Sequence, residues 1–257
     1  MFLHLLLSTI VCAAPDQGDI LVTLPDVAHV EAKPVDSPAS YIIHILDWHF
    51  VDKDTFIADL RDQGITEDLD AKYAKHLADV EQVQAEQMTL LRTLVEKHSV
   101  TDVYVEGVTA NAGPEYERRL ITLKQLREKL RLLQKIAGEI DDADLRQKVK
   151  AGEHALRKEL LRVGAAGQLQ MDGLLKTLPA EDKQAFEAAR PVAPNGRVKL
   201  DAKLIEARED AIVKNVLARG PVSLLVLGGA HDLSNNVPKD CQYIRVSTKA
   251  FEAMLRE

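Results

Sequence analysis

Three reactive side chains stand at the ends of three separate apolar runs: His49, Glu106 and His231. In an open α/β sheet, ligands bind outside the carboxyl ends of the strands, so these side chains are expected to meet at one edge. Two histidines and a carboxylate can bind zinc or manganese with a position left open for water. Without a metal, the same side chains could transfer protons. A histidine at a strand end is also often a hydrogen-bonded structural residue, and that alternative stays open.

The segments that carry these residues alternate between strand and helix patterns. Short runs rich in Val, Ile and Leu predict buried strands, and longer stretches with apolar residues three and four apart predict helices. Strands separated by helices indicate an α/β fold with a largely parallel central sheet flanked by helices. The predicted strands are residues 41–46, 102–107, 222–227 and 243–246, and the predicted flanking helices are residues 69–98 and 200–219.

A helical insertion of about residues 115–197 separates the second and third of these strands. Leucines at helical spacing predict two helices, and the break at residues 138–141 joins them into an αα-hairpin. Such a charged hairpin is usually a solvated pair of helices, although it could also dock a protein partner. Residues 41–257 are therefore expected to form a single α/β domain with this insertion.

The amino-terminal segment has the pattern of an export signal. Residues 1–14 are mostly apolar and end in small residues, which predicts a signal peptide cleaved after Ala13 or Ala14. Lipid anchoring at Cys12 is the less favoured alternative. Residues 15–40 contain several prolines and predict a tether, with an edge strand at residues 20–24. The expected location is periplasmic or extracellular, with no transmembrane span in the mature chain.

Composition excludes several classes of protein. The chain has 257 residues and a formal net charge of −7, which gives no overall attraction to nucleic-acid phosphates. Its 2 cysteines exclude a disulfide-framed mini-protein, and Cys241 is interpreted as a buried thiol. Only 4% of the residues are aromatic, which argues against stacking platforms for bases or sugars. A small-molecule or peptide substrate is the expected ligand.

Four other polar residues stand in apolar or helical surroundings. His44 lies inside the first strand and is interpreted as a satisfied core histidine. Arg208 could stabilise a developing oxyanion or hold a substrate carboxylate, because its planar fork suits both. It could equally form an ion pair on its own helix. His76 and Gln87 lie on the apolar stripe of residues 69–98, from which they could reach the same cleft or bridge helix contacts.

Four motifs in a fixed order carry a family resemblance: Asp47–His49 after a strand, a strand ending in Glu106, an Arg-acid helix at Arg208–Asn215, and the Gly-x-x-His of Gly228–His231. In this order the chain resembles the Tiki/TraB/ChaN/erythromycin-esterase superfamily over about residues 41 to 246. Two positions depart from the family pattern: Leu46 replaces a glycine, and Ile212 stands in a methionine position. The helix with His76 and Gln87 is similar to that of the ChaN-like branch.

The resemblance implies different functions for different branches. Tiki-like members are metal-dependent peptidases, erythromycin-esterase members hydrolyse an ester, and ChaN-like members bind haem. It implies His49, Glu106 and His231 as ligands of zinc or manganese, with Glu106, Arg208 and His231 as the catalytic set. His76 and Gln87 would then bind a cofactor, with haem as the alternative to the metal.

Three hypotheses follow from the residues and the resemblance together. The first is an exported metal-dependent hydrolase of a peptide or ester that uses the strand-end His/Glu/His cleft. The second is a non-enzymatic haem- or iron-binding protein. The third is a degenerate family member that contacts a protein partner through its helical hairpin.

Overall fold

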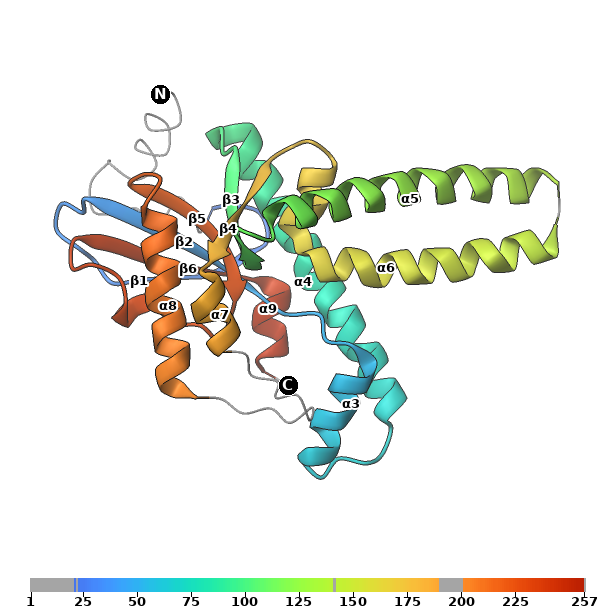
Figure 1. Cartoon of the computed structure of the whole chain (residues 1–257), viewed down its shortest axis with the longest axis horizontal. Helices are drawn as coiled ribbons and strands as arrows, with labels where there is room; N and C mark the ends of the chain where they lie inside the picture. Colours follow the sequence, from blue (N-terminus) through green and yellow to red (C-terminus); the bar gives the residue numbers. More distant parts are fainter. Residues whose placement is uncertain (1–20, 22, 141, 190–200, 257) are drawn as a thin grey trace.

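The computed structural model describes residues 21, 23–140, 142–189 and 201–256, and these contain one six-stranded sheet. The strand order is β1-β6-β2-β5-β3-β4, with β1 antiparallel to β6 and every other neighbouring pair parallel. Helices flank the sheet, which confirms the predicted α/β class (Figure 1). The strands are β1 (Val27–Ala32), β2 (Ser40–Asp47), β3 (Asp102–Thr109), β4 (Lys176–Glu181), β5 (Val222–Gly228) and β6 (Cys241–Thr248).

The central strands are apolar on both faces because helices cover both sides of the sheet. Ile42 and Ile45 of β2 point to opposite faces, and both are almost fully buried. Leu225 and Leu227 of β5 share the face of Ile42 and are also fully buried. Parallel strands in such a layer read as continuous apolar runs rather than alternating ones, which is why their positions could be predicted closely.

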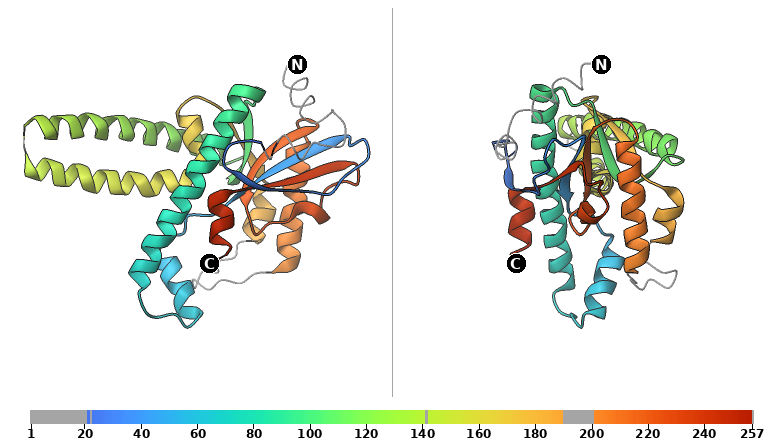
Figure 2. Two further views of the ribbon diagram at one scale, coloured as in Figure 1. Left: turned by 180° about the vertical axis from the view of Figure 1, so that it is seen from behind. Right: turned by 90° about the vertical axis from the view of Figure 1, so that its left-hand side faces the viewer.

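Two helical layers enclose the sheet (Figure 2). On one face, α4 (Leu69–His98) packs Leu90, Leu91 and Leu94 against the strands, together with the carboxyl-terminal part of α6 (Ala143–Met171). On the other face, α8 (Ala202–Leu217) packs its own apolar stripe against the strands. The shorter helices are α3 (Lys53–Asp62), α7 (Lys183–Ala188) and α9 (Lys249–Met254), and a 3-10 turn, η1, covers Leu233–Asn235.

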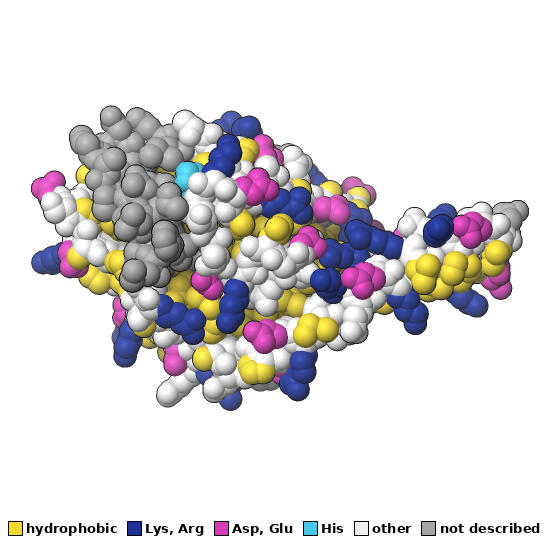
Figure 3. All heavy atoms as spheres, turned by 90° about the horizontal axis from the view of Figure 1, so that it is seen from above, with side chains coloured by type: hydrophobic (Ala, Val, Ile, Leu, Met, Phe, Trp, Pro, Cys, Tyr) yellow, Lys and Arg dark blue, Asp and Glu magenta, His cyan; other side chains and the backbone are white. Residues whose placement is uncertain are grey.

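The helices α5 (Gly113–Glu139) and α6 form the predicted hairpin, which projects from the sheet domain (Figure 1). Within it, Leu120, Leu123 and Leu130 pack against Leu156 and neighbouring residues of α6. Hydrophobic side chains also lie exposed along the projecting part (Figure 3). The exposed apolar residues of α5 and its end are Ile121, Leu126, Leu132 and Ile140.

A break in α6 marks the point where the hairpin meets the domain. Gly164 has a φ of 69°, outside the helical range, so the chain changes direction there. A Cβ atom at Gly167 would lie 2.5 Å from the Tyr116 hydroxyl oxygen, which shows how closely α5 approaches this turn. Gly164 thus permits the change of direction, and Gly167 permits the close contact with α5.

Both edge strands differ from the sequence-based prediction. The predicted strand at residues 20–24 is absent from the described part of that range, and the edge strand is instead β1, inside the predicted tether. The predicted insertion of residues 115–197 is also not wholly helical: its hairpin ends at Met171, β4 then joins the sheet beside β3, and α7 follows. Pro179 made β4 hard to recognise, since proline cannot donate to a sheet ladder and is confined to edges, where β4 indeed lies.

Several predictions concern residues outside the described range. The signal peptide of residues 1–14, Cys12, the first part of the tether and the last residues of the predicted insertion, 190–197, all lie there. Among the described residues, no helix combines the length and apolarity needed to cross a bilayer.

Candidate functional site

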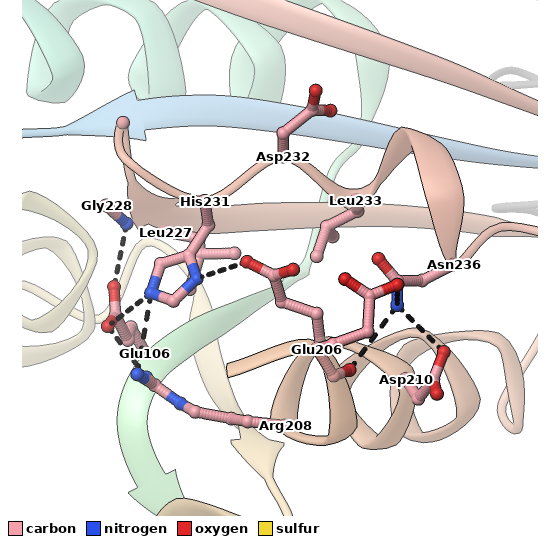
Figure 4. A network of polar contacts seen from close by, with 12 residues as sticks. Glu106, Glu206, Arg208, Asp210, Leu227, Gly228, His231, Asp232, Leu233 and Asn236 are labelled. Atoms are coloured by element: carbon pink, nitrogen blue, oxygen red, sulfur yellow. Dashed lines mark hydrogen bonds and ion pairs between the residues drawn. The ribbon is translucent and has the colours of Figure 1, made fainter. Parts of the chain in front are cut away.

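Glu106 is the centre of a polar cluster at the carboxyl edge of the sheet (Figure 4). Its Oε2 atom lies 2.9 Å from His49 Nε2 and accepts a hydrogen bond from the Gly228 amide at 2.7 Å. Its Oε1 atom accepts a 2.7 Å hydrogen bond from Arg208 Nη2 and lies 3.4 Å from His231 Nε2. The structure therefore brings together all the residues predicted as metal ligands or as the catalytic set.

A bulge in β3 aims Glu106 at this cluster. The pairing of β3 with β4 shifts register between Val105 and Thr109, and Gly107 adopts a φ of 74° within that shift. A bulge rotates the side chains next to it, and a positive φ favours glycine. Glu106 thus lies within the strand rather than at its end, where the sequence had indicated it.

Two adjacent glycines at the end of β5, Gly228 and Gly229, leave room for side chains that pack directly against the backbone there. A Cβ atom at Gly228 would lie 2.3 Å from His49 Nε2 and 3.2 Å from Glu106 Oε2. A Cβ atom at Gly229 would lie 2.2 Å from the Phe251 ring. Since real Cβ atoms do not approach heavy atoms so closely, any larger residue at Gly228 displaces the His49 imidazole.

Arg208 extends from α8 into the cluster and is held by two carboxylates. Besides Glu106, its guanidinium donates to both carboxylate oxygens of Glu181 at the end of β4, in a fork-to-fork pair. The Phe186 ring of α7 lies 5.1 Å from the guanidinium carbon. Burial would lower the pKa of Arg208, but the two carboxylates outweigh it and raise that pKa, so the guanidinium is a fixed cation. The Arg208 ion pair is therefore formed with two strands and not along its own helix.

His231 has a different partner at each ring nitrogen. Its Nδ1 atom lies 2.8 Å from Glu209 Oε1, and its Nε2 atom lies 3.4 Å from both Arg208 Nη1 and Glu106 Oε1. Burial lowers the pKa of His231, but hydrogen bonds to Glu106 and Glu209 outweigh it and raise the pKa to about 9. The short contact thus fixes the ring, while the long contacts leave Nε2 free to exchange a proton.

His49 is the most exposed member of the cluster, with 49% of its side-chain surface accessible. Its Nδ1 atom lies 3.4 Å from Asp47 Oδ2, opposite its contact with Glu106. Burial would lower the pKa of His49, but the charge of Glu106 and the hydrogen bonds to both carboxylates raise it well above its usual value. Burial would raise the pKa of Glu106, but His49, His231 and Arg208 outweigh it and hold that pKa well below its usual range. His49 is therefore an imidazolium at neutral pH, where it can donate a proton to a ligand.

The cluster fits a metal ion poorly as it stands. Glu106 already has four donors around its two oxygens, and one of them is the guanidinium of Arg208, whose fixed charge repels a second cation. Within the part of the chain that the structure describes, no group of three or more His, Cys, Asp or Glu side chains is arranged to hold a metal ion. The predicted zinc or manganese stays a prediction, and the chemistry proposed below uses neither.

His76 and Gln87, the predicted cofactor ligands, support the segment that carries His49. Gln87 is fully buried and donates to the Leu46 carbonyl oxygen at 3.0 Å and to Asp47 Oδ1 at 2.9 Å. His76 Nε2 accepts a 3.3 Å hydrogen bond from the Val51 amide, and its ring stacks on Phe56. These contacts correspond to the bridging role that the sequence left open, and haem binding stays a prediction.

His44 is a satisfied core histidine, as the sequence indicated. It is fully buried, with Nδ1 at 2.7 Å from the Tyr243 hydroxyl oxygen and Nε2 at 2.9 Å from the Leu227 carbonyl oxygen. Burial lowers the pKa of His44 to about 4, so it stays neutral and is not part of the reactive cluster.

Sequence reasoning assigned no role to Glu181 or Glu209. Glu209 stands next to Arg208 in the Arg-acid motif, so its signal was present in the sequence. Glu181 follows a proline-containing segment that was not recognised as a strand, so its place at the sheet edge could not be predicted.

Comparisons with protein-family models, with curated proteins and with solved structures find no match to this chain.

Proposed function

We propose that this protein is a hydrolase of an ester or peptide bond that works by proton transfer at His231 and charge stabilisation at Arg208. The observation that carries the proposal is the position of His231 between Glu209 and Arg208, with Nδ1 held at 2.8 Å and Nε2 only loosely held at 3.4 Å. A carboxylate that orients a histidine, beside a fixed cation, is the arrangement that acyl transfer to water needs. The ester or peptide class itself rests on the motif resemblance.

His231 moves the proton in this mechanism. In its neutral form, Nδ1–H donates to Glu209 and Nε2 accepts a proton from an attacking water molecule. The hydroxide equivalent forms a bond to the carbonyl carbon, and the carbonyl π electrons move onto oxygen. When the tetrahedral intermediate collapses, the bond to the leaving group breaks, and His231 returns the proton to the leaving oxygen or nitrogen.

Arg208 stabilises the oxyanion formed during attack. Its Nη2 and Nε atoms are engaged with Glu106 and Glu181, while Nη1 has only the 3.4 Å contact with His231 Nε2. A weakly engaged donor on an otherwise immobile guanidinium is preorganised for developing negative charge. The two carboxylates keep Arg208 in place without using this donor.

His49 lies at the open side of the cluster and supplies a second proton donor. Its Nε2–H is held by Glu106 at 2.9 Å, whereas Nδ1–H lies 3.4 Å from Asp47 Oδ2 and can turn to hydrogen-bond the substrate carbonyl or leaving group. Glu106 is then a positioning residue that aligns His49, Arg208 and the Gly228 amide.

Hydrolysis of a panel of p-nitrophenyl esters and short blocked peptides tests the function. We expect measurable turnover by the parent protein and a loss of kcat/KM of about 100-fold or more in His231→Gln, as for removal of a general base. His154→Gln, which changes an exposed histidine of α6, is the matched control and should keep the parent rate. Turnover that survives His231→Gln, or its absence from every ester and peptide, contradicts the proposal.

We also propose that the protein is exported, with the signal peptide of residues 1–14 removed. The support is the apolar segment with small residues at its end. Amino-terminal sequencing of protein recovered outside the cytoplasm should begin at Ala14 or Pro15, whereas an intact Met1 would contradict export by this route.

A further inference from the structure

A cavity of about 340 Å³ lies beside the reactive cluster, on the other side of the loop that follows β5. Its volume falls within the range of small-molecule pockets, about 300–1,000 Å³. Asp232, at one wall, points away from His231 and Arg208 (Figure 4). None of the residues proposed above for catalysis lines this cavity. It is therefore a separate site.

The cavity is lined by more cations than carboxylates, on a chain whose net charge is −7. The cations are Lys33, Lys239 and Arg245, and the carboxylates are Glu31 and Asp232. Lys33 and Arg245 also lie close enough to Asp232 to help keep its pKa low, against the effect of burial. A locally positive hollow in an acidic protein attracts small anions more than its surroundings do.

Both carboxylates already have partners within the wall. Glu31 Oε2 lies 3.3 Å from Arg245 Nη1, and Asp232 Oδ1 accepts a 3.0 Å hydrogen bond from the Ser234 amide. Lys33 and Lys239, by contrast, form no ion pair with any residue that the structure describes. The two ammonium groups are thus the free charges of the site.

Arg245 is the third cation and is only partly used. Its guanidinium, 22% exposed as a side chain, donates to Glu31 and, through Nη2, to the Gly229 carbonyl oxygen at 3.0 Å. The Nε atom is buried without a hydrogen-bond partner among the described residues. Only two of the five N–H groups of this guanidinium are therefore matched, so its charge is weakly compensated at the cavity.

Apart from Ser234 and Asn235, the rest of the wall is mostly apolar. Val35, Val237 and Pro238 line it together with the Tyr243 ring, whose hydroxyl is engaged with His44 and the Leu233 amide. A ligand that fits this lining has an apolar part several atoms long and an anionic end. A bare inorganic anion would leave the apolar wall without a partner.

We propose that this cavity binds a small organic carboxylate with a short aliphatic chain. Lys33 and Lys239 hold its carboxylate, and the aliphatic chain lies against Val237 and the neighbouring apolar residues. The site is independent of the proposed hydrolase chemistry, since it shares no side chain with it.

Ligand-observed NMR titration with hexanoate, at low ionic strength and with the full chain, tests the site. We expect saturable binding with a Kd of about 1 mM, which is typical of a ligand of this size. The uncharged hexan-1-ol and inorganic phosphate should each bind at least about tenfold more weakly, because each satisfies only one part of the cavity. Hexanoate affinity should also fall as salt screens the lysines.

The double variant Lys33→Gln/Lys239→Gln removes both free cations and should weaken hexanoate binding at least about tenfold. Lys124→Gln/Lys150→Gln, on exposed positions of the hairpin, makes the same change in net charge and should bind like the parent. Thermal unfolding of both double variants checks that they are folded. No saturable binding to the parent, equal binding to both double variants, or phosphate binding as tight as hexanoate overturns the proposal.

Discussion

At the scale of single residues, Glu106 determines the geometry of the site. One carboxylate aligns an imidazole, a guanidinium and a backbone amide that come from three different segments. The same carboxylate raises the pKa of His49 and His231, because its charge lies beside both rings. The reactive states of the two histidines therefore depend on this residue, although it does not itself exchange a proton in the proposed mechanism.

Gly228 is the position where the smallest substitution should have the largest effect. In Gly228→Ala the new methyl group meets His49 Nε2 and Glu106 Oε2, so the imidazole must leave its ion pair. We expect kcat/KM for ester hydrolysis to fall at least about tenfold, with a loss of stability of about 1–3 kcal/mol from overpacking. Enzyme assays and urea unfolding measure the two effects.

Gly138→Ala is the matched control for that substitution. A Cβ atom at Gly138 meets no atom within 4 Å, and the residue lies in α5, where alanine is the better helix former. Unchanged activity and equal or higher stability are expected. An active Gly228→Ala protein with His49 still paired to Glu106 would show that the close contact does not matter.

At the scale of elements, the sequence analysis located the strands and helices that have a regular apolar pattern and missed the two strands at the edges of the sheet. The central strands β2 and β5 are continuous apolar runs, and α4 has a regular apolar stripe, so both were located closely. β1 and β4 are edge strands, where one side has no partner and polar or small residues interrupt the Val and Leu residues. Their pairing depends on the neighbouring strand rather than on their own sequence.

Because edge strands could not be recognised, only the part of the site that lies on the central strands could be predicted from the sequence. His49, Glu106 and His231 were found because each lies at or near the carboxyl end of a recognisable strand. The ion pair between Arg208 and Glu181 was not found, because it joins α8 to the unrecognised β4. The bulge at Gly107 leaves no mark in the apolar pattern of the sequence, so the direction in which Glu106 points could be seen only in the structure.

The outer part of the α5–α6 hairpin should be separable from the reactive cluster. A Cβ atom at Gly152 would lie 2.7 Å from the Leu130 side chain, so these residues face each other across the hairpin. Replacing residues 131–151 with a short Gly/Ser loop removes the outer part of the projecting hairpin (Figure 1). We expect kcat/KM within about twofold of the parent, because no residue of the cluster contacts this part.

Circular dichroism and the ester assay together measure that outcome. The helical signal should fall while activity and cooperative unfolding persist. Loss of activity in a folded, shortened protein would mean that the projecting helices contribute to the site, and the proposed mechanism would then be incomplete.

At the scale of the whole molecule, an acidic chain concentrates four carboxylates and three cationic side chains at one edge of its sheet. The carboxylates are Asp47, Glu106, Glu181 and Glu209, and the cations are His49, Arg208 and His231. Charges of opposite sign alternate through this cluster, with one carboxylate more than there are cations. Both oxygens of Glu106 already have donors, and the fixed charge of Arg208 repels a metal ion, which favours proton transfer over metal chemistry as the proposed function.

Removal of metal ions tests that distinction. Dialysis against EDTA should leave the ester hydrolysis rate unchanged, because the proposed mechanism needs only side chains and water. Elemental analysis of the purified protein, with the His49→Ala/His231→Ala double variant as the control, completes the test. About one zinc or manganese per chain that is lost in the double variant, together with inactivation by EDTA, would instead support the metal centre that the family resemblance implies.

The pH dependence of hydrolysis tests the central claim most directly, because it reports the titration of the residue proposed to act as base. His231 must be neutral to accept a proton, and its pKa is raised to about 9, so kcat/KM for an ester should rise as the pH increases towards 9 and then level off. Glu209→Gln removes a carboxylate that raises this pKa, so the rise should move to lower pH, with a reduced plateau rate. The matched variant Asp210→Asn, which changes the neighbouring exposed carboxylate, should keep the parent profile. A profile that is flat between pH 6 and 10, or that does not move in Glu209→Gln, would contradict a Glu209–His231 base.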